Sequence, residues 1–306
     1  MKSLATLQYL QELSIADSDL LEDNLSQLNS MKSINELTLD NCPVTSRGLS
    51  LLQELLGPNI TSLALKGLII NDEDLVHLSG ITECVTLDLS DTQVTGSGLT
   101  PIPASNLNHL ILNGCPLTPV GMKEISQLPF MAYLDINHSH NLTVDTIKAL
   151  QPDSPLSLSV KDCAFSREEL IALFEIPHLV SLDLSHAQFD PAILVEITRA
   201  TELERLFLEG VPLANADLSS LNKLHKLYTL NLNETELTDE QLKSICPHPM
   251  LSQLYLQKTN VTDDSYLLLQ LNKCPNLGHL FLQGTSIDEE GQDRFRSTLI
   301  NAMIEF

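Results

Sequence analysis

Apolar residues recur along the chain at an almost constant interval, and this pattern predicts most of the structure. Leu13 serves as a phase marker for the pattern. The equivalent residue returns every 23 to 26 positions, at Leu37, Leu63, Leu87, Leu110, Leu134, Leu158, Leu182, Leu206, Leu230, Leu254 and Leu280. A fixed period of this length is typical of stacked structural repeats, so the sequence predicts twelve of them.

Each repeat follows the template LxxLxLxx(T/C)xLTDxxLxxL, which is nearly intact from Leu227 to Ile245. The L-x-L pair, Leu230 and Leu232 in that repeat, predicts a short strand whose alternate residues point inward. A Ser, Thr, Asn or Asp then opens a short helix as an N-cap residue. Between strand and helix lies a small polar or thiol residue, expected to face the core: Ser18, Cys42, Thr92, Cys115, Ser139, Cys163, Thr235, Thr259 and Thr285.

These elements predict an α/β repeat fold. One strand and one short helix cannot bury their own apolar side, so neighbouring repeats must stack. We expect a right-handed solenoid with a concave parallel sheet and helices on its convex side. A single domain is predicted over residues 1–306, with an N-terminal half-repeat cap at 1–12, repeats at 13–291 and a C-terminal capping helix at 292–306. Leu4, Leu7 and Leu10 supply the first cap, and Phe295, Leu299, Ile300 and Met303 supply the second.

The charge balance changes the picture of possible partners. The chain has 40 acidic and 17 basic residues, for a formal net charge of −23. Phosphate backbones and anionic lipids repel such a chain, so we expect no nucleic-acid and no membrane partner. The charge serves either solubility or the attraction of a basic partner, and the sequence leaves both open.

The cysteines and the start of the chain indicate a reducing compartment. The repeat pattern begins within the first residues, where a signal peptide would lie, and no apolar run approaches the ~18 residues of a membrane span. Six cysteines lie far apart without the spacing of a zinc site. We therefore expect reduced thiols, no metal or other cofactor, and a cytoplasmic environment.

The template resembles leucine-rich repeats, specifically the short variety that contains Thr or Cys. The resemblance covers essentially the whole chain and implies the fold directly. It is similar to the repeat part of F-box proteins and to bacterial effectors of the kind found in Legionella. The second likeness implies a virulence protein that is secreted and translocated into the host cytoplasm. An ordinary cytosolic protein is the alternative.

No catalytic motif appears in the sequence, and we expect no enzyme. A G-x-S-x-G elbow, a P-loop and an HExxH motif are all missing. His138 and His140 flank Ser139, but the phase of the repeat predicts structural roles for them. Asp88, Asp135 and Asp183 share one concave column at alternate strands, about 10 Å apart, too far to share a metal ion. They form either a solvated face or a row for basic groups of a partner.

The concave face offers the best candidate binding site. Four of the 13 aromatic residues fall on it. Phe207, Tyr255 and Phe281 share the middle column near the C-terminal end, and Tyr133 lies further toward the N-terminus. Exposed aromatics beside arginine are typical of interface hot spots, although isolated ones need no partner. The candidate partner-binding residues are Arg205, Phe207, Glu209, Gln253, Tyr255, Gln257, His279, Phe281, Tyr133, Asp183 and Asp135.

The sequence therefore predicts a non-catalytic module that binds a folded protein in its concave face. The partner is another protein, an enzyme or a second effector, and it carries basic groups if the acidic charge attracts it. The acidic repeat protein ribonuclease inhibitor suggests, by analogy of fold alone, inhibition by occlusion. The alternative is a substrate receptor or adaptor of a ubiquitin-ligase complex, which needs an F-box outside these repeats. We expect the chain alone to be a monomer.

Overall fold

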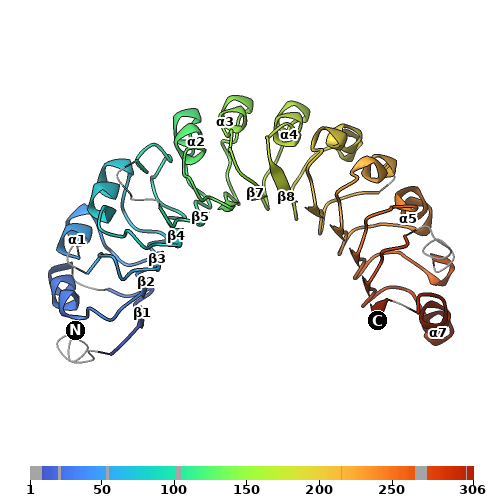
Figure 1. Ribbon diagram of the computed structural model, residues 1–306, viewed down its shortest axis with the longest axis horizontal. Helices are drawn as coiled ribbons and strands as arrows, with labels where there is room; N and C mark the ends of the chain where they lie inside the picture. Colours follow the sequence, from blue (N-terminus) through green and yellow to red (C-terminus); the bar gives the residue numbers. More distant parts are fainter. Residues whose placement is uncertain are drawn as a thin grey trace. The chain divides into compact units, whose positions relative to one another are not determined.

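A computed structural model describes residues 9–19, 22–52, 55–100, 102, 105–214, 216–265, 274–300 and 302–306 (Figure 1). The chain divides into two compact units, Met1–Leu156 and Ser157–Phe306, which are treated separately below. Strand β7 (Leu156–Ser159) contains the division. Leu4 and Leu7 of the predicted N-terminal cap lie outside the described residues, and the prediction of a single domain stays a prediction.

The first unit is a ladder of parallel strands joined by short helices. Its strands pair in chain order with the marker leucines opposite one another, from Leu13 beside Leu37 to Leu110 beside Leu134. The strands are β1 (Glu12–Ser14), β2 (Glu36–Thr38), β3 (Ser62–Ala64), β4 (Thr86–Asp88), β5 (His109–Ile111) and β6 (Tyr133–Asp135). The connections hold the α-helices α1 (Ser46–Leu51), α2 (Pro119–Ile125) and α3 (Val144–Lys148) and the 3₁₀ helices η2 (Glu22–Ser30) and η3 (Asp72–Leu78).

The second unit repeats this arrangement. Its strands are β8 (Leu179–Asp183), β9 (Arg205–Phe207), β10 (Thr229–Asn231), β11 (Gln253–Tyr255), β12 (His279–Phe281) and β13 (Met303–Glu305), again parallel and in chain order. The connections hold α4 (Arg167–Phe174), η4 (Pro191–Arg199), η5 (Ser219–Lys223), α5 (Asp239–Ile245), η6 (Asp263–Ser265) and α7 (Glu289–Thr298). Within each unit the helices lie on one side of the strands and leave the other sheet face uncovered (Figure 1).

The predicted phases are confirmed at every marker position. All twelve marker leucines lie in strands, and each is buried. Burial of a leucine side chain stabilises a fold by about 1.5–3 kcal/mol. Since each strand is only three to five residues long, these leucines hold their strands mainly through the repeats on either side.

The polar ladder position has a definite physical role. Thr92, Thr235 and Thr259 are buried, and each hydroxyl donates a hydrogen bond of 2.6–2.7 Å to the carbonyl three residues earlier. The Cys115 thiol likewise donates to a backbone carbonyl, that of Leu89. A buried carbonyl without a donor costs about 1–3 kcal/mol, which explains why Thr or Cys occupies this position. Ser18 and Thr285, near the two ends, are only half-buried.

A residue with positive φ follows each of the strands β1 to β12. In the first unit the position holds Asp17, Asn41, Gly67, Asp91, Gly114 and His138, and in the second it holds Asp162, His186, Gly210, Glu234, Lys258 and Gly284. This left-handed turn lets the chain leave the sheet at the same point in each repeat. His138 thus occupies the left-handed turn position of its repeat.

The helix starts are bound in two ways, one of which the sequence did not predict. Ser166 and Glu169 form a capping box at the start of α4, with bonds of 3.3 and 2.8 Å. Thr45, at the N-cap position of α1, makes no cap bond with its side chain. Its backbone N–H and hydroxyl instead donate to Glu22, one repeat earlier.

The same link recurs along the chain. Thr95 donates its N–H and hydroxyl to Asp72, at 3.0 and 2.6 Å, and Thr262 makes the equivalent pair of bonds to Asp239. The acidic residue of the LTD segment thus binds the start of the next repeat. The template contains the residue, but its partner lies about one period away in sequence.

The C-terminal end differs from the prediction of one closing helix. Helix α7 ends at Thr298, and Met303–Glu305 forms strand β13 beside β12. Phe295 is buried as predicted, whereas Ile300 and Met303 are 78% and 57% exposed. The added strand satisfies the backbone groups of β12, which an exposed sheet edge would leave unpaired. Phe306 then packs edge-on against Phe295, at 6.0 Å between ring centroids.

None of the helices in the described part of the chain has the length and hydropathy of a membrane-spanning segment.

The Glu22 link should make stability depend on pH. Burial raises the pKa of Glu22, but hydrogen bonds from Thr45 and Gly48 and the charge of Arg47 together hold the pKa below its ordinary value of 4.5. A lowered folded-state pKa stabilises the fold above the unfolded pKa and loses that contribution as the pH falls through the folded pKa. We expect Glu22→Gln to lower the free energy of unfolding by about 1 kcal/mol at pH 7.

Urea denaturation at pH 7 and pH 3.5 measures this effect. The difference between Glu22→Gln and the native chain should shrink at pH 3.5, because this pH lies below the unfolded pKa and the contribution of the charge falls as the pH approaches the folded pKa. Glu73→Gln, which removes an exposed carboxylate from the first turn of η3, is the matched control and should change little. A Glu22→Gln effect of equal size at both pH values would contradict the role of the charge.

Candidate functional site

The uncovered face of β9 to β13 carries the densest set of predicted site residues. We call it the C-terminal sheet face and define it by three columns of side chains. The first column is Arg205, Thr229, Gln253 and His279, the middle column is Phe207, Asn231, Tyr255, Phe281 and Glu305, and the third column is Glu209, Asn233, Gln257 and Gln283. The parallel register places the members of each column side by side on successive strands.

The three aromatics of the middle column do not form one cluster. Tyr255 and Phe281 stack face to face, with ring centroids 4.4 Å apart and an interplanar angle of 4°. Phe207 lies two strands from Tyr255, because Asn231 occupies the position between them. All three rings are half-buried, so each presents only part of its surface to solvent.

Strand β10 forms the floor of the face between two aromatic residues. Thr229 and Asn231 are only 4% and 8% exposed, although their side chains lie on the side without helices. Their register neighbours are the longer side chains of Arg205 and Gln253, and of Phe207 and Tyr255. These longer neighbours cover the short side chains of β10, and Phe207 and Tyr255 flank Asn231 on the two adjoining strands.

A chain of side-chain amides fixes the third column. Asn233 donates to Gln257 at 2.9 Å, Gln257 donates to Gln283 at 2.8 Å, and Gln283 donates to the Glu305 carboxylate at 2.9 Å. We call these four residues the amide ladder. All its bonds point the same way, toward the negative charge of Glu305, and such chains strengthen each member by polarisation. The ladder holds the face rigid beside the aromatics.

The first column is held by bonds within the second unit. Arg205 donates to the Tyr228 hydroxyl at 3.1 Å and to the Ser157 hydroxyl at 3.2 Å. Gln253 accepts from the Thr229 hydroxyl at 3.1 Å. The Nδ1 atom of His279 is buried and has no hydrogen-bond partner within the described part of the chain.

Charged groups around the C-terminal sheet face are largely paired with each other. Lys161 reaches the Asp183 carboxylate at 3.0 Å, and Lys258 reaches Glu234 at 2.6 Å. The hydrogen bond between Lys258 and Glu234 lowers the pKa of the Glu234 carboxyl and raises the pKa of the Lys258 ammonium group. Glu209 accepts from Asn231 at 3.0 Å. Asp183 thus already has a basic partner in its own chain.

The remaining predicted site residues lie in the first unit, where the sheet face is acidic. Tyr133 is 47% exposed, and its ring tilts toward His109, which pairs with Asp135 at 3.0 Å. Burial and the nearby charges of Asp88 and Asp17 raise the pKa of Asp40, against a hydrogen bond from the Lys66 N–H. This face resembles the C-terminal sheet face in backbone but lacks its stacked aromatics and amide ladder.

Five residues of the C-terminal sheet face are absent from the candidate residues predicted from the sequence: Thr229, Asn231, Asn233, Gln283 and Glu305. Asn231 and Asn233 have the same phase as Phe207 and Glu209, so the repeat itself contained the signal. Glu305 could not be found, because the segment was expected to be helical.

The groups that suggested chemistry lie apart or inside the core. Ser139 is buried at the ladder position, and all six cysteines are buried and none of them is in a disulfide. Burial raises the pKa of Cys84 to about 12. In the described ranges no group of three His, Cys, Asp or Glu side chains could hold a metal ion. The C-terminal sheet face offers stacking and hydrogen bonds for binding.

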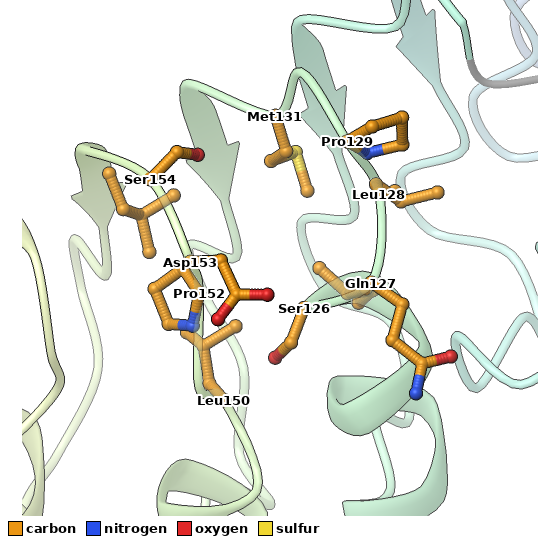
Figure 2. Close-up of a pocket in the computed structure, with 11 residues that line it drawn as sticks. Ser126, Gln127, Leu128, Pro129, Met131, Leu150, Pro152, Asp153 and Ser154 are labelled. Atoms are coloured by element: carbon orange, nitrogen blue, oxygen red, sulfur yellow. The ribbon is translucent and has the colours of Figure 1, made fainter.

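A pocket in the first unit is the second candidate site (Figure 2). The segments that leave α2 and α3 form it, with walls from Leu128, Met131, Leu150 and Leu156. Figure 2 shows the Asp153 carboxylate pointing toward Ser126. The Ser126 hydroxyl already accepts from the Gln151 N–H at 2.7 Å and donates to the Met122 carbonyl. The pocket is an apolar gap between successive repeats with one carboxylate at its mouth.

Comparison with known proteins agrees with this architecture. The family described as Leucine Rich repeat matches residues 104–126, about one repeat. No curated protein matches the sequence. The fold is similar to an internalin (inlF) of Listeria monocytogenes, at 17% identity and a TM-score of 0.50, over 98% of this chain and 87% of that one. It is also similar to TLR13, solved in a complex with ssRNA13, at 18% identity and a TM-score of 0.59. That match covers 96% of this chain but only 44% of TLR13.

The aromatic stack should be measurable as a coupling between two side chains. A stacked pair contributes about 0.5–1.5 kcal/mol beyond the burial of each ring. In a double-mutant cycle with Tyr255→Ala and Phe281→Ala, we expect a coupling of that size in the free energy of unfolding. The control cycle pairs Phe207→Ala with Phe281→Ala, which lie three strands apart and should be additive. Equal coupling in the two cycles would contradict the observed spacing of the rings.

Proposed function

Because the chain is a leucine-rich-repeat protein, we propose that it is a recognition module that binds a folded partner protein on its C-terminal sheet face. Arrays of stacked repeats present extended concave surfaces for binding. The observation that supports this site is the Tyr255–Phe281 stack beside the amide ladder. These side chains are already ordered before any partner arrives.

Side chains that are ordered before binding favour association, because flexible interface side chains would otherwise lose conformational entropy when the partner binds. Each immobilised flexible side chain costs about 0.5–1.5 kcal/mol. Gln257 and Gln283 have long, flexible side chains, yet each is fixed by hydrogen bonds to the residues before and after it in the amide ladder. Phe207 and Tyr255 flank Asn231 on the neighbouring strands. A side chain of the partner that lies over β10 would contact both rings.

We favour a protein over an RNA as the partner. TLR13 is described in a complex with single-stranded RNA, and aromatic side chains can stack on bases. Phosphate groups, however, need basic side chains, and the net charge of this chain is −23. The lysines near the C-terminal sheet face, Lys161 and Lys258, are paired with carboxylates of the chain itself. Fluorescence anisotropy with labelled single-stranded RNA should detect no binding at physiological salt.

The finer proposal is that the partner is an enzyme, inhibited by occlusion, and that the chain acts as a bacterial effector. This step rests on the resemblance of the repeats to effector proteins and on the acidic charge, which would attract a basic partner. Electrostatic attraction of this kind mainly raises the association rate and weakens with salt. Association with the partner should therefore slow several-fold between 50 and 300 mM salt.

The variant Phe207→Ala/Tyr255→Leu tests the site. It removes both rings that flank Asn231 of β10, while leucine keeps an apolar contact on Phe281. We expect partner capture to weaken at least tenfold, since buried aromatics at interface centres contribute about 2 kcal/mol or more. Affinity capture with cross-linking and mass spectrometry identifies both the partner and the contacted residues.

The matched control is Phe130→Ala, which removes an aromatic that is 60% exposed in the first unit and away from the sheet. Both variants should unfold within a few degrees of the native chain. Unchanged capture by Phe207→Ala/Tyr255→Leu, or cross-links confined to the acidic first unit, would overturn the proposed face. Capture of ubiquitin-ligase subunits would favour an adaptor over an inhibitor.

A further inference from the structure

Two cysteines that are far apart in sequence meet in the second unit. Cys246 follows α5, and Cys274 precedes β12. Their sulfur atoms lie 3.1 Å apart, closer than ordinary contact between two thiols. In a disulfide the sulfurs are about 2.05 Å apart, so a movement of about 1 Å separates this pair from a bond.

The pair differs from the other four thiols in access. Cys42, Cys84, Cys115 and Cys163 are 1–2% exposed, and hydrogen bonds hold Cys42, Cys84 and Cys115 to backbone carbonyls. Cys246 and Cys274 are 5% and 6% exposed and lie outside the ladder position of the repeat. They are the most accessible of the six thiols, which suits a small oxidant.

From this geometry we infer that Cys246 and Cys274 form a peroxide-sensitive dithiol that oxidises to a disulfide between neighbouring repeats. In the first step the Cys274 thiolate attacks hydrogen peroxide. An S–O bond forms, the O–O bond breaks, and the departing hydroxide takes a proton to become water. Cys274 is then a sulfenic acid.

In the second step the Cys246 sulfur attacks the Cys274 sulfur. The S–S bond forms as the S–O bond breaks, and the leaving hydroxide takes the Cys246 thiol proton to become a second water. Overall, two thiols and one hydrogen peroxide give one disulfide and two waters. The sulfur atoms are oxidised and the peroxide oxygens are reduced.

The surroundings indicate which sulfur reacts first. The hydrogen bond from Cys246 lowers the pKa of Cys274 more than burial raises it, and the backbone N–H of His248 lowers it further. A thiolate is the nucleophilic form of cysteine. The His248 side chain is fully buried, and burial lowers its pKa, so it stays neutral beside the pair.

The disulfide would close a loop that contains all of β11, including Tyr255. A crosslink restricts the unfolded chain and so raises the temperature of unfolding. The consequence for the protein is a second unit that becomes more stable under oxidising conditions, without any change to the polar groups of the C-terminal sheet face.

The test treats the native chain with hydrogen peroxide, alkylates the remaining thiols and maps them by mass spectrometry. We expect a Cys246–Cys274 linked peptide, loss of alkylation at these two positions only, and recovery of both with dithiothreitol. The melting temperature should rise with oxidation in the native chain but not in Cys246→Ser. In Cys246→Ser, a dimedone-type probe should label Cys274; in Cys274→Ser, Cys246 should stay unlabelled.

Cys115→Ser is the matched control and should oxidise like the native chain at the other positions. Circular dichroism shows whether each variant folds, and the peptide map of the native chain stands without any variant. Four outcomes overturn the inference: a linked peptide found only after unfolding in guanidinium, links between separate chains, equal loss at all six thiols, or no loss at Cys246 and Cys274.

Discussion

The structure depends on one constraint, the inability of a single repeat to bury its own leucines. Strands of three to five residues bury little surface alone, and each marker leucine is covered only because the next repeat places its own leucine beside it. The parallel register is therefore fixed by packing, and polar residues can vary freely on the uncovered face. That freedom lets the two units carry different surfaces on the same backbone.

The constraint also explains the polar residues inside the core. Leaving the strand at the same point in every repeat buries a carbonyl, which the ladder threonine or cysteine satisfies, and requires a left-handed residue. Because the helices of neighbouring repeats start side by side, the carboxylate at the start of one helix accepts a hydrogen bond from the backbone N–H at the start of the next, as Asp72 does from Thr95. The thiols and most hydroxyls of the repeat are thus explained by the fold.

Sequence reasoning recovered what the period determines. The strands, the buried ladder and the columns of the sheet face follow from counting residues from Leu13. Contacts between residues one period apart, such as that of Glu22 with Thr45, were missed. The pattern gives the position of each residue within its repeat, but not which residues of the neighbouring repeat its side chain contacts. The same limit applied to the binding face: counting placed Phe207 and Tyr255 in one column, but Asn231 between them divides the aromatics into a pair and a single ring. Strand β13 was missed because its apolar residues also fit one face of a helix.

The end of the array links the fold to the proposed site. If β12 were the edge strand of the sheet, its backbone groups would be exposed and unpaired, and pairing with β13 prevents this. The same strand brings Glu305 to the end of the amide ladder, where its charge accepts the last hydrogen bond. Strand β13 therefore both protects the sheet edge and orders the face beside the Tyr255–Phe281 stack. A face that is rigid for structural reasons is well suited to binding, because its order does not have to be created by the partner.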